Sequence, residues 1–315
     1  MECVLGIDVG GTSIKAGLFS VAGDLLGTEQ VPTGKLDNQA AFDEVTAGLL
    51  RLVTSAGATA GDVHAVGLDV PGPVDDQGRI GLLPNITLDA DALKAAIRQT
   101  FPAAALAFVN DANAAALGEL WQGSAKDVDS FVMVTLGTGV GGGVVCGGRL
   151  VSGAFGAGGE IGHITVNEGE ERVCGCGRRG CLEQYASAKG IVYLYGRECE
   201  RRGVEGVAVA HETDTLSVFE ASRAGDEAAT AAIGTMAERL GYALAQISCV
   251  VDPACYLIGG GVAGGFDLFG GRLGEAFRSH CLKPSAAAEI RACSLGNEAG
   301  MYGAAYSALQ VAQDA

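Results

Sequence analysis

The sequence predicts an α/β protein of two domains, and three observations support this class. Apolar runs typical of strands alternate along the chain with stretches in which apolar residues recur at helical spacing, as in sheets covered by helices. The chain has 315 residues, which is long for a single hydrophobic core. A strand, a turn of glycine and threonine, and a second strand occur twice, at residues 3–20 and 131–148. We interpret this repeat as an internal duplication, with one copy in each half.

The first half of the chain alternates between strands and helices. Its first apolar run ends at Asp8, a Gly-Gly-Thr turn follows, and a second run begins at Ile14, which predicts a hairpin. Between residues 38 and 55 apolar side chains recur every three or four residues, which predicts a helix. The other elements expected in this half are strands over 25–30, 64–70 and 105–109 and helices over 88–101 and 112–121.

The second half begins with the repeated hairpin and continues with more helix than strand. We expect helices over 186–201, 216–224, 226–251 and 268–281 and a short strand over 255–258. A last helix, over 300–313, is expected to return to the first domain. The predicted domains are a small one, residues 1–120 with the C-terminal helix 300–315 packing back on it, and a large one, residues 121–299.

The composition argues against several classes of partner. Asp and Glu number 37 against 21 Lys and Arg, so the formal charge is −16, and such a field repels nucleic acid and anionic membrane surfaces. No apolar run approaches the roughly 20 uncharged residues of a spanning helix, and Met1 is followed at once by an acidic residue. We therefore expect a cytoplasmic protein without a membrane partner. An anionic nucleotide can still bind, because backbone N–H groups in glycine turns attract phosphate locally.

The first hairpin has the residues of a phosphate-binding turn. Gly10 and Gly11 permit close approach of the backbone, while Thr12 and Lys15 can meet phosphate oxygens. Asp8, at the end of the first strand, can orient a water on Mg²⁺. An ordinary glycine turn would show the same short pattern, so this motif alone leaves both interpretations open.

The second hairpin decides between them, because it repeats the turn at Gly137, Thr138 and Gly139. Two such hairpins facing each other would hold a triphosphate from both sides, and a structural turn gives no reason for the repetition. The run Gly259, Gly260 and Gly261, after a buried strand, offers a flat surface for an adenine ring. We expect a side chain at Gly11 or Gly139 to block the triphosphate and no other ligand.

Five segments in this order resemble the ROK family of sugar kinases and sugar-responsive repressors: DVGGT, LGTGVGGG, GEIGH, CGCGRRGCLE and LIGGGVA. The resemblance covers nearly the whole chain. It implies the two-domain fold of the actin-like ATPase superfamily, with ATP at the base of a cleft between the domains and the sugar above it. Within the family, SGAFGAGGEIGHI and GCLEQYAS are most similar to segments of bacterial glucokinases.

An aspartate between an apolar strand and an alanine-rich helix is the predicted catalytic base. Asp111 stands where ligands gather in α/β proteins, although most aspartates at such positions only cap the helix. The resemblance places the base at Asp111, which would take the proton of the attacking sugar hydroxyl. Asn110 would then hydrogen-bond neighbouring hydroxyls. The resemblance also brings Gly72 and Asn85 to the sugar pocket, although Ile86 and Thr87 depart from the usual continuation after Asn85.

Two carboxylates and an imidazole flank a cysteine-rich loop, and carboxylates that accept from vicinal hydroxyls are a common means of recognising a sugar. The resemblance implies that Glu160, His163 and Glu183 contact the sugar; isolated solvated acids are the alternative.

The cysteines form two groups. Cys174, Cys176 and Cys181 crowd into one loop among glycines and arginines, and with His163 they make a tetrahedral ligand set for structural Zn²⁺. The other seven are expected to be buried free thiols: Cys3, Cys146, Cys199, Cys249, Cys255, Cys281 and Cys293.

These observations predict an enzyme that uses ATP and Mg²⁺ to phosphorylate glucose at its 6-hydroxyl. Kinases of N-acetylmannosamine, N-acetylglucosamine, fructose or mannose are the alternative within the same resemblance. A sugar-sensing repressor is disfavoured because the first strand begins at residue 3, which leaves no room for a DNA-binding domain, and because the charge is wrong for DNA. The resemblance also suggests a homodimer or homotetramer.

Overall fold

The computed structural model describes residues 2–11, 13–75, 77–81, 83, 86–206 and 214–314. The chain divides into two compact units. The first unit comprises Met1–Asp129, Gly143–Gly159 and Ser294–Ala315, and the second comprises Ser130–Gly142 and Glu160–Cys293. The segment Gly143–Gly159, which the sequence analysis put in the large domain, thus lies with the first unit. One reason is that Gly143 packs directly on Ala116 of a helix in that unit.

The first sheet has the strand order β3-β2-β1-β4-β5. Its strands are β1 (Cys3–Val9), β2 (Ser13–Ser20), β3 (Leu25–Pro32), β4 (Val63–Val70) and β5 (Ala105–Asn110). The β1–β2 and β2–β3 pairs are antiparallel, and the β1–β4 and β4–β5 pairs are parallel. The register places Asp8 opposite both Lys15 on β2 and Asp69 on β4, so these three charged residues lie in one row across the sheet.

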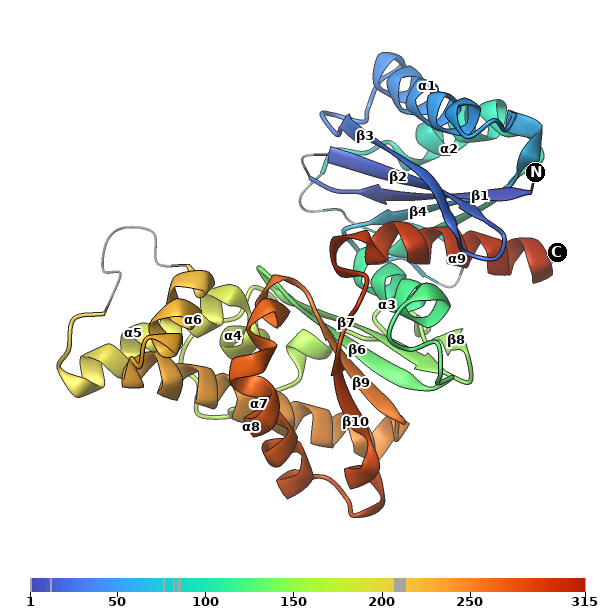
Figure 1. Cartoon of the computed structure of the whole chain (residues 1–315). Helices are drawn as coiled ribbons and strands as arrows, with labels where there is room; N and C mark the ends of the chain where they lie inside the picture. Colours follow the sequence, from blue (N-terminus) through green and yellow to red (C-terminus); the bar gives the residue numbers. More distant parts are fainter. Residues whose placement is uncertain are drawn as a thin grey trace. The chain divides into compact units, whose positions relative to one another are not determined.

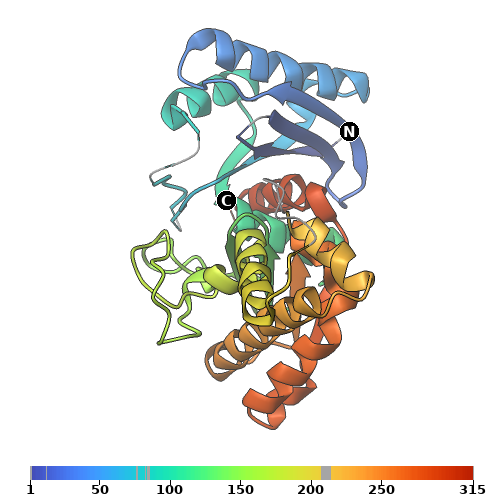
Figure 2. The same cartoon turned by 90° about the vertical axis from the view of Figure 1, so that its left-hand side faces the viewer.

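Helices cover both faces of this sheet. On one face, α1 (Gln39–Ser55) and α2 (Ala90–Thr100) pack on Leu5, Ile7 and Leu68. Figure 2 shows these two helices in blue and teal. On the other face, α9 (Ala299–Asp314) lies against the sheet beside α3 (Asp111–Gln122), as Figure 1 shows. Strand side chains alternate between the two faces, so Asp8 and Asp69 point to the α9 side.

Glycines allow α9 to approach its neighbours closely. A Cβ atom at Gly6 or Gly67 would collide with the backbone carbonyl oxygen of Met301 or Ala304 on α9. Where α3 and α9 meet, Gly303 faces the backbone of Ala114 in the same way. The last helix therefore packs backbone against backbone at these glycines.

The second sheet has the order β10-β9-β6-β7-β8. Its strands are β6 (Phe131–Leu136), β7 (Val140–Cys146), β8 (Arg149–Leu150), β9 (Cys255–Gly259) and β10 (Glu289–Ala292). Counted from its hairpin, this order repeats that of the first sheet, so the duplication extends beyond the two hairpins to the whole sheet plan. The sequence pattern predicts neither β8 nor β10, because both are short and β10 alternates charged with small or branched residues at an edge of the sheet.

The helices of the second unit are α4 (Glu183–Ala186), α5 (Ala188–Arg202), α6 (Thr215–Arg223), α7 (Glu227–Val251) and α8 (Phe266–His280). The helix expected over 186–201 is preceded by α4, because Ser187 caps α5 by accepting a hydrogen bond from the backbone N–H of Gly190. The long α7 packs between α5 and α8 and buries Leu240 and Leu244 completely. Short 3₁₀ helices span Ala60–Asp62, Ile161–His163, Gly261–Gly265, Pro284–Ala287 and Gly296–Glu298.

The expectation that the seven scattered cysteines are buried is wrong for two of them. Cys3, Cys199 and Cys255 are buried, and Cys281 and Cys293 are half-buried. Cys146 is exposed because it ends β7 just before a glycine turn, and Cys249 is exposed on the outer side of α7. Among the described residues, none of the helices combines the length and apolar character that crossing a bilayer requires.

Candidate active site

Asp111 begins α3 immediately after β5 ends. The N-cap of this helix is Asn110, whose side-chain oxygen accepts from the backbone N–H groups of Ala112 and Asn113 at 3.0 and 3.1 Å. The capping role considered for Asp111 therefore belongs to its neighbour. The Asn110 amide nitrogen donates to the Gly72 carbonyl at 3.1 Å and to the Asp111 carboxylate at 2.9 Å. Asn110 thus ties the exposed Asp111 carboxylate to the loop after β4.

The row of charged residues across the first sheet, Lys15, Asp8 and Asp69, ends next to Asp111. Asp8 and Asp69 occupy neighbouring strands, and burial raises the pKa of Asp69 well above its usual value, with the charges of Asp8 and Asp111 raising it further. Burial also raises the pKa of Asp8, against the lowering effects of its hydrogen bond with Asp69 and of the Lys15 charge. Asp69 is not among the predicted site residues, although a single acid inside the apolar run HAVGLDV is a usable signal.

The tip of the first hairpin is open. Gly10 donates to the Ser13 carbonyl at 3.1 Å, and its own carbonyl accepts from the Thr33 hydroxyl at 2.6 Å. Gly11 is exposed, and a Cβ built on it meets no atom within 4 Å. Lys15, behind the tip, is half-buried beside Asp8. Of the other predicted site residues, Thr12 and Asn85 lie outside the residues that the structure describes.

The second hairpin lines a cavity of about 430 Å³. Gly137 and Thr138 lie on one side of this cavity, and Gly261 lies at the start of the 3₁₀ helix after β9. Of the three glycines predicted to carry an adenine ring, Gly261 alone is among the residues that line it. Gly259 packs on Met133 and Cys293, and Gly260 has a positive φ of 82° against the Leu136 backbone, so their glycine character serves the fold.

The same cavity is closed by residues that the sequence analysis missed. Leu216, Phe219 and Arg223 lie on one face of α6, and Leu216 is 60% exposed despite its apolar side chain. The spacing of these residues was visible, but it predicts only a helix face. A hydrogen bond between residues distant in sequence helps to hold this face near the hairpin: the hydroxyl of Thr215 donates to the Ala188 carbonyl at 3.0 Å.

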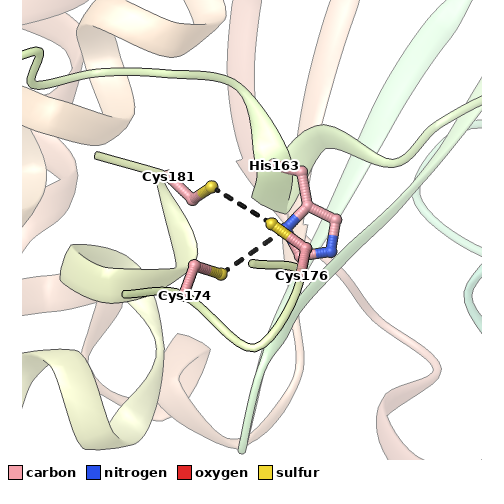
Figure 3. A group of neighbouring side chains, drawn as sticks. All are labelled: His163, Cys174, Cys176 and Cys181. Carbon is pink, nitrogen blue, oxygen red and sulfur yellow. Dashed lines mark hydrogen bonds between the residues drawn. The ribbon is translucent and has the colours of Figure 1, made fainter. Parts of the chain in front are cut away.

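The four predicted zinc ligands lie together in the second unit (Figure 3). The ligand atoms of His163, Cys174, Cys176 and Cys181 all lie within 4.8 Å of one another. The sulfurs of Cys176 and Cys181 are 3.6 Å apart, and the Cys174 sulfur is 3.8 Å from Nδ1 of His163. A tetrahedral Zn²⁺ with bonds of about 2.3 Å to sulfur requires ligand atoms about 3.8 Å apart. The residues present therefore fit this ion.

The loop that carries the cysteines is shaped by glycine. Gly177 and Gly180 adopt positive φ angles of 83° and 74°, which other residues rarely accept. The Arg178 guanidinium donates to the His163 carbonyl at 2.8 Å. A hydrogen bond from the backbone N–H of Arg178 is the main cause that lowers the pKa of Cys176 to about 6. Burial raises the pKa of Cys181 to about 12.

His163 has two neighbours of different chemistry. Its Nδ1 faces Cys174, and its Nε2 lies 3.9 Å from a carboxylate oxygen of Glu160. Glu183, the first residue of α4, approaches the same cysteine, with its Oε1 3.7 Å from the Cys174 sulfur. The structure thus brings together the predicted metal ligands and the predicted sugar-binding acids of this unit.

Glu183 also connects this cluster to the second hairpin. Its Oε2 accepts from the Val140 backbone N–H at 3.2 Å, and a Cβ atom at Gly139 would lie 2.5 Å from that oxygen. A side chain at Gly139 would therefore meet a predicted sugar-binding residue first. This differs from the expectation that Gly139 concerns the phosphates alone. Gly137 is the better position for a substitution that tests the nucleotide site alone, because a Cβ atom there meets nothing within 4 Å.

Comparison with known proteins shows similarity over nearly the whole chain. The chain is 34% identical to the glucokinase of Halalkalibacterium halodurans over 306 residues, covering 95% of this chain and 92% of the relative. It is 29% identical to the N-acetyl-D-glucosamine kinase of Haemophilus influenzae over 313 residues, with coverage of 95% and 97%. Among solved structures, the ROK family glucokinase of Streptomyces griseus, determined with glucose and AMPPNP, is 32% identical; its TM-score is 0.75, with coverage of 99% and 100%.

These similarities confirm the predicted fold class. The chain is an α/β protein of the actin-like ATPase fold, with two five-stranded sheets of the same strand order. The model of the ROK family matches residues 4–311, nearly the full length. The chain therefore belongs to the ROK family.

Proposed function

We propose that this sugar kinase of the ROK family transfers the γ-phosphoryl group of ATP to the 6-hydroxyl of glucose. The observation that carries the proposal is the position of Asp111, an exposed carboxylate at the end of β5 that Asn110 holds by a hydrogen bond of 2.9 Å. A carboxylate fixed in this way is suited to act as a general base. The similarity to a glucokinase over 95% of the chain supports glucose as the acceptor.

In the proposed reaction, Asp111 accepts the proton of the 6-hydroxyl while the sugar oxygen bonds to the γ-phosphorus. The bond between that phosphorus and the bridging oxygen breaks, and ADP leaves. Asn110 holds the base in position, because its amide uses both N–H groups and both lone pairs within the protein. A direct contact of Asn110 or of Gly72 with the sugar stays a prediction, as does that of Asn85.

The nucleotide is proposed to bind through the two hairpins. The adenine ring would occupy the cavity lined by Gly261, Leu216 and Phe219, whose volume of about 430 Å³ is ample for a base. Gly137 and Thr138 border the same cavity, and Gly10 and Gly11 form the tip of the other hairpin. Mg²⁺ bound with ATP would neutralise charge on the phosphates, and Asp8 is the residue proposed to hold one of its waters.

Sugar recognition is assigned to the group around His163. Zn²⁺ held by Nδ1 of His163 and by the thiolates of Cys174, Cys176 and Cys181 would fix the tautomer and orientation of the imidazole. Nε2 would then face a sugar hydroxyl together with the Glu160 carboxylate, which lies 3.9 Å away. Glu183 supplies the second carboxylate.

A turnover assay with a panel of hexoses and N-acetylhexosamines tests this proposal. Purified protein with ATP and Mg²⁺ is expected to give its highest kcat/KM with glucose. The alternative acceptor is N-acetylglucosamine, because a relative that phosphorylates it is 29% identical over nearly the whole chain. A higher kcat/KM with any N-acetylhexosamine, fructose or mannose would refute the assignment to glucose while leaving the kinase assignment intact. Size-exclusion chromatography with light scattering would test the expected homodimer or homotetramer.

A further inference from the structure

Asp69 is a buried carboxyl group to which the proposed reaction assigns no role. It lies on the central strand β4 with 1% of its surface exposed. Neither of its carboxylate oxygens receives a hydrogen bond from the residues that the structure describes. An ionised carboxylate in such a place would be strongly destabilising, because burial removes its hydration and nothing replaces it.

The surroundings of Asp69 explain how it is tolerated. On one side lies Asp8 of β1, close enough for the two carboxyl groups to share a hydrogen bond, and beyond it Lys15 of β2. On the other side lies Asp111, where α3 follows β5, and Asp111 adds negative charge. From α9, the glycine Gly300 presents its backbone and no charged side chain; a Cβ atom there would lie 2.9 Å from Oδ2 of Asp69.

Two carboxylates in hydrogen-bond contact cannot both be ionised at low cost, so one proton is retained by the pair. Burial decides which group keeps it. Asp69 is the more buried and faces two negative neighbours, whereas Asp8 has Lys15 beside it. A neutral Asp69 has an O–H group, and the Asp8 carboxylate is an acceptor within its reach.

We propose that Asp69 is a positioning residue of the kinase reaction, which keeps a proton and donates its O–H to the Asp8 carboxylate. This bond fixes the rotamer of Asp8 and leaves Asp8 ionised, with its other oxygen available for the magnesium nucleotide. Gly300 is required at the start of α9 so that the helix can cover the pair and exclude water. The inference rests on the proposed function, since it assigns Asp8 to the nucleotide.

Kinetic measurements on two variants test the donor role. Asp69→Ala removes the donor and is expected to lower kcat by roughly 10-fold or more while raising KM for ATP more than KM for the sugar. Asp69→Asn keeps an N–H donor in the same place and is expected to restore most of the lost activity. Asp91→Asn, the same change at an exposed position on α2, is the control and should leave the kinetics unchanged.

The pH profile separates this role from a merely structural one. In the wild type, kcat/KM is expected to fall on the alkaline side as Asp69 loses its proton and adds a third negative charge beside Asp8 and Asp111. Asp69→Asn has no proton to lose at this position and should lack that limb. An alkaline limb identical in wild type and Asp69→Asn, or an Asp69→Ala variant as active as wild type, would overturn the proposal. So would a stoichiometric Mn²⁺ bound without nucleotide in wild type and lost in Asp69→Asn, because the pair would then hold a cation instead of a proton.

A readout without turnover distinguishes failure of this proposal from failure of the proposed function. The folded state holds a proton on Asp69, whereas the unfolded chain releases this proton above a pKa of about 4. The contribution of Asp69 to the free energy of unfolding is therefore fully present below that pH, and it is lost as the pH rises toward the raised pKa of the folded state. The unfolding equilibrium constant of wild type relative to Asp69→Asn should therefore rise by up to about tenfold per pH unit in that window. This pH dependence is expected even if glucose is not the substrate. Its absence would show that Asp69 does not hold the proton.

Discussion

Asp111 follows the helix cap and does not supply it, so its chemistry can be tested with little effect on folding. Asp111→Asn leaves the cap to Asn110 and keeps a side-chain oxygen that can accept from the Ala112 N–H, a bond of 2.8 Å here. We expect the melting temperature to stay nearly constant while kcat falls by roughly 10²–10⁴. Calorimetry would measure the melting temperature, and steady-state kinetics on the same preparation would measure kcat. Undiminished turnover would remove Asp111 from the mechanism.

Gly137 and Gly139, two residues apart, form a matched pair for separating the nucleotide from the sugar. Gly137→Ala places a methyl group at the edge of the 430 Å³ cavity, where nothing else is displaced. We expect it to raise KM for ATP by several-fold to about 100-fold, the range of a steric clash of 1–3 kcal/mol, with little change for the sugar. Gly139→Ala pushes on Glu183 and should raise KM for the sugar as well. An unchanged KM for ATP in Gly137→Ala would contradict the assignment of this cavity.

The cysteine loop is the element through which metal and sugar are expected to be coupled. Cys176 is exposed, so Cys176→Ser removes one proposed zinc ligand without leaving a cavity in a hydrophobic core. The loop leads into α4 and Glu183, and it carries Cys174 next to His163. We expect less bound zinc, measured by metal analysis, and a sugar affinity that falls far more than the affinity for ATP.

Two results would contradict this coupling. One is wild-type protein that contains no zinc after purification without chelators. The other is a zinc-free Cys176→Ser variant that binds glucose as the wild type does. Calorimetric titrations with glucose and with AMPPNP give the two affinities separately. The control is Cys249→Ser, since Cys249 is also exposed but lies on α7 and is not part of the cluster of His163 and three cysteines.

At the scale of elements, the sequence predicts those features that depend on residues close together in the chain. The main helices and strands follow from periodicity, and the cluster of His163 with three cysteines follows from cysteines two and five residues apart. The pairing of β4 with β1 is a contact across some sixty residues, and only this pairing sets Asp69 beside Asp8. The α6 wall of the cavity was missed for the same reason, because no local pattern tells which surface a helix face will meet.

Over the whole molecule, the two sheets share one plan, but the rest of the chain differs between the copies. Both have a hairpin followed by parallel strands added on the same side. The first copy adds a carboxylate at the end of its last strand, and the second adds α4 to α8 and the cysteine loop. Duplication therefore accounts for the two glycine turns that are proposed to bind phosphate. The residues proposed to bind the sugar and to act as base have no counterpart in this shared strand plan.

The close packing of α9 has a consequence for the order in which the protein can form during synthesis. The first sheet ends at Asn110, yet the helix that covers Val4, Ala65 and Ala107 is α9, which begins only at Ala299. Every residue of the second unit, up to Cys293, is translated before that helix. The first unit thus begins before the second and is completed after it, and one apolar face of its sheet stays uncovered until α9 has been translated. A nascent chain stalled before Ala299 would be a natural client for chaperones that bind exposed apolar strands.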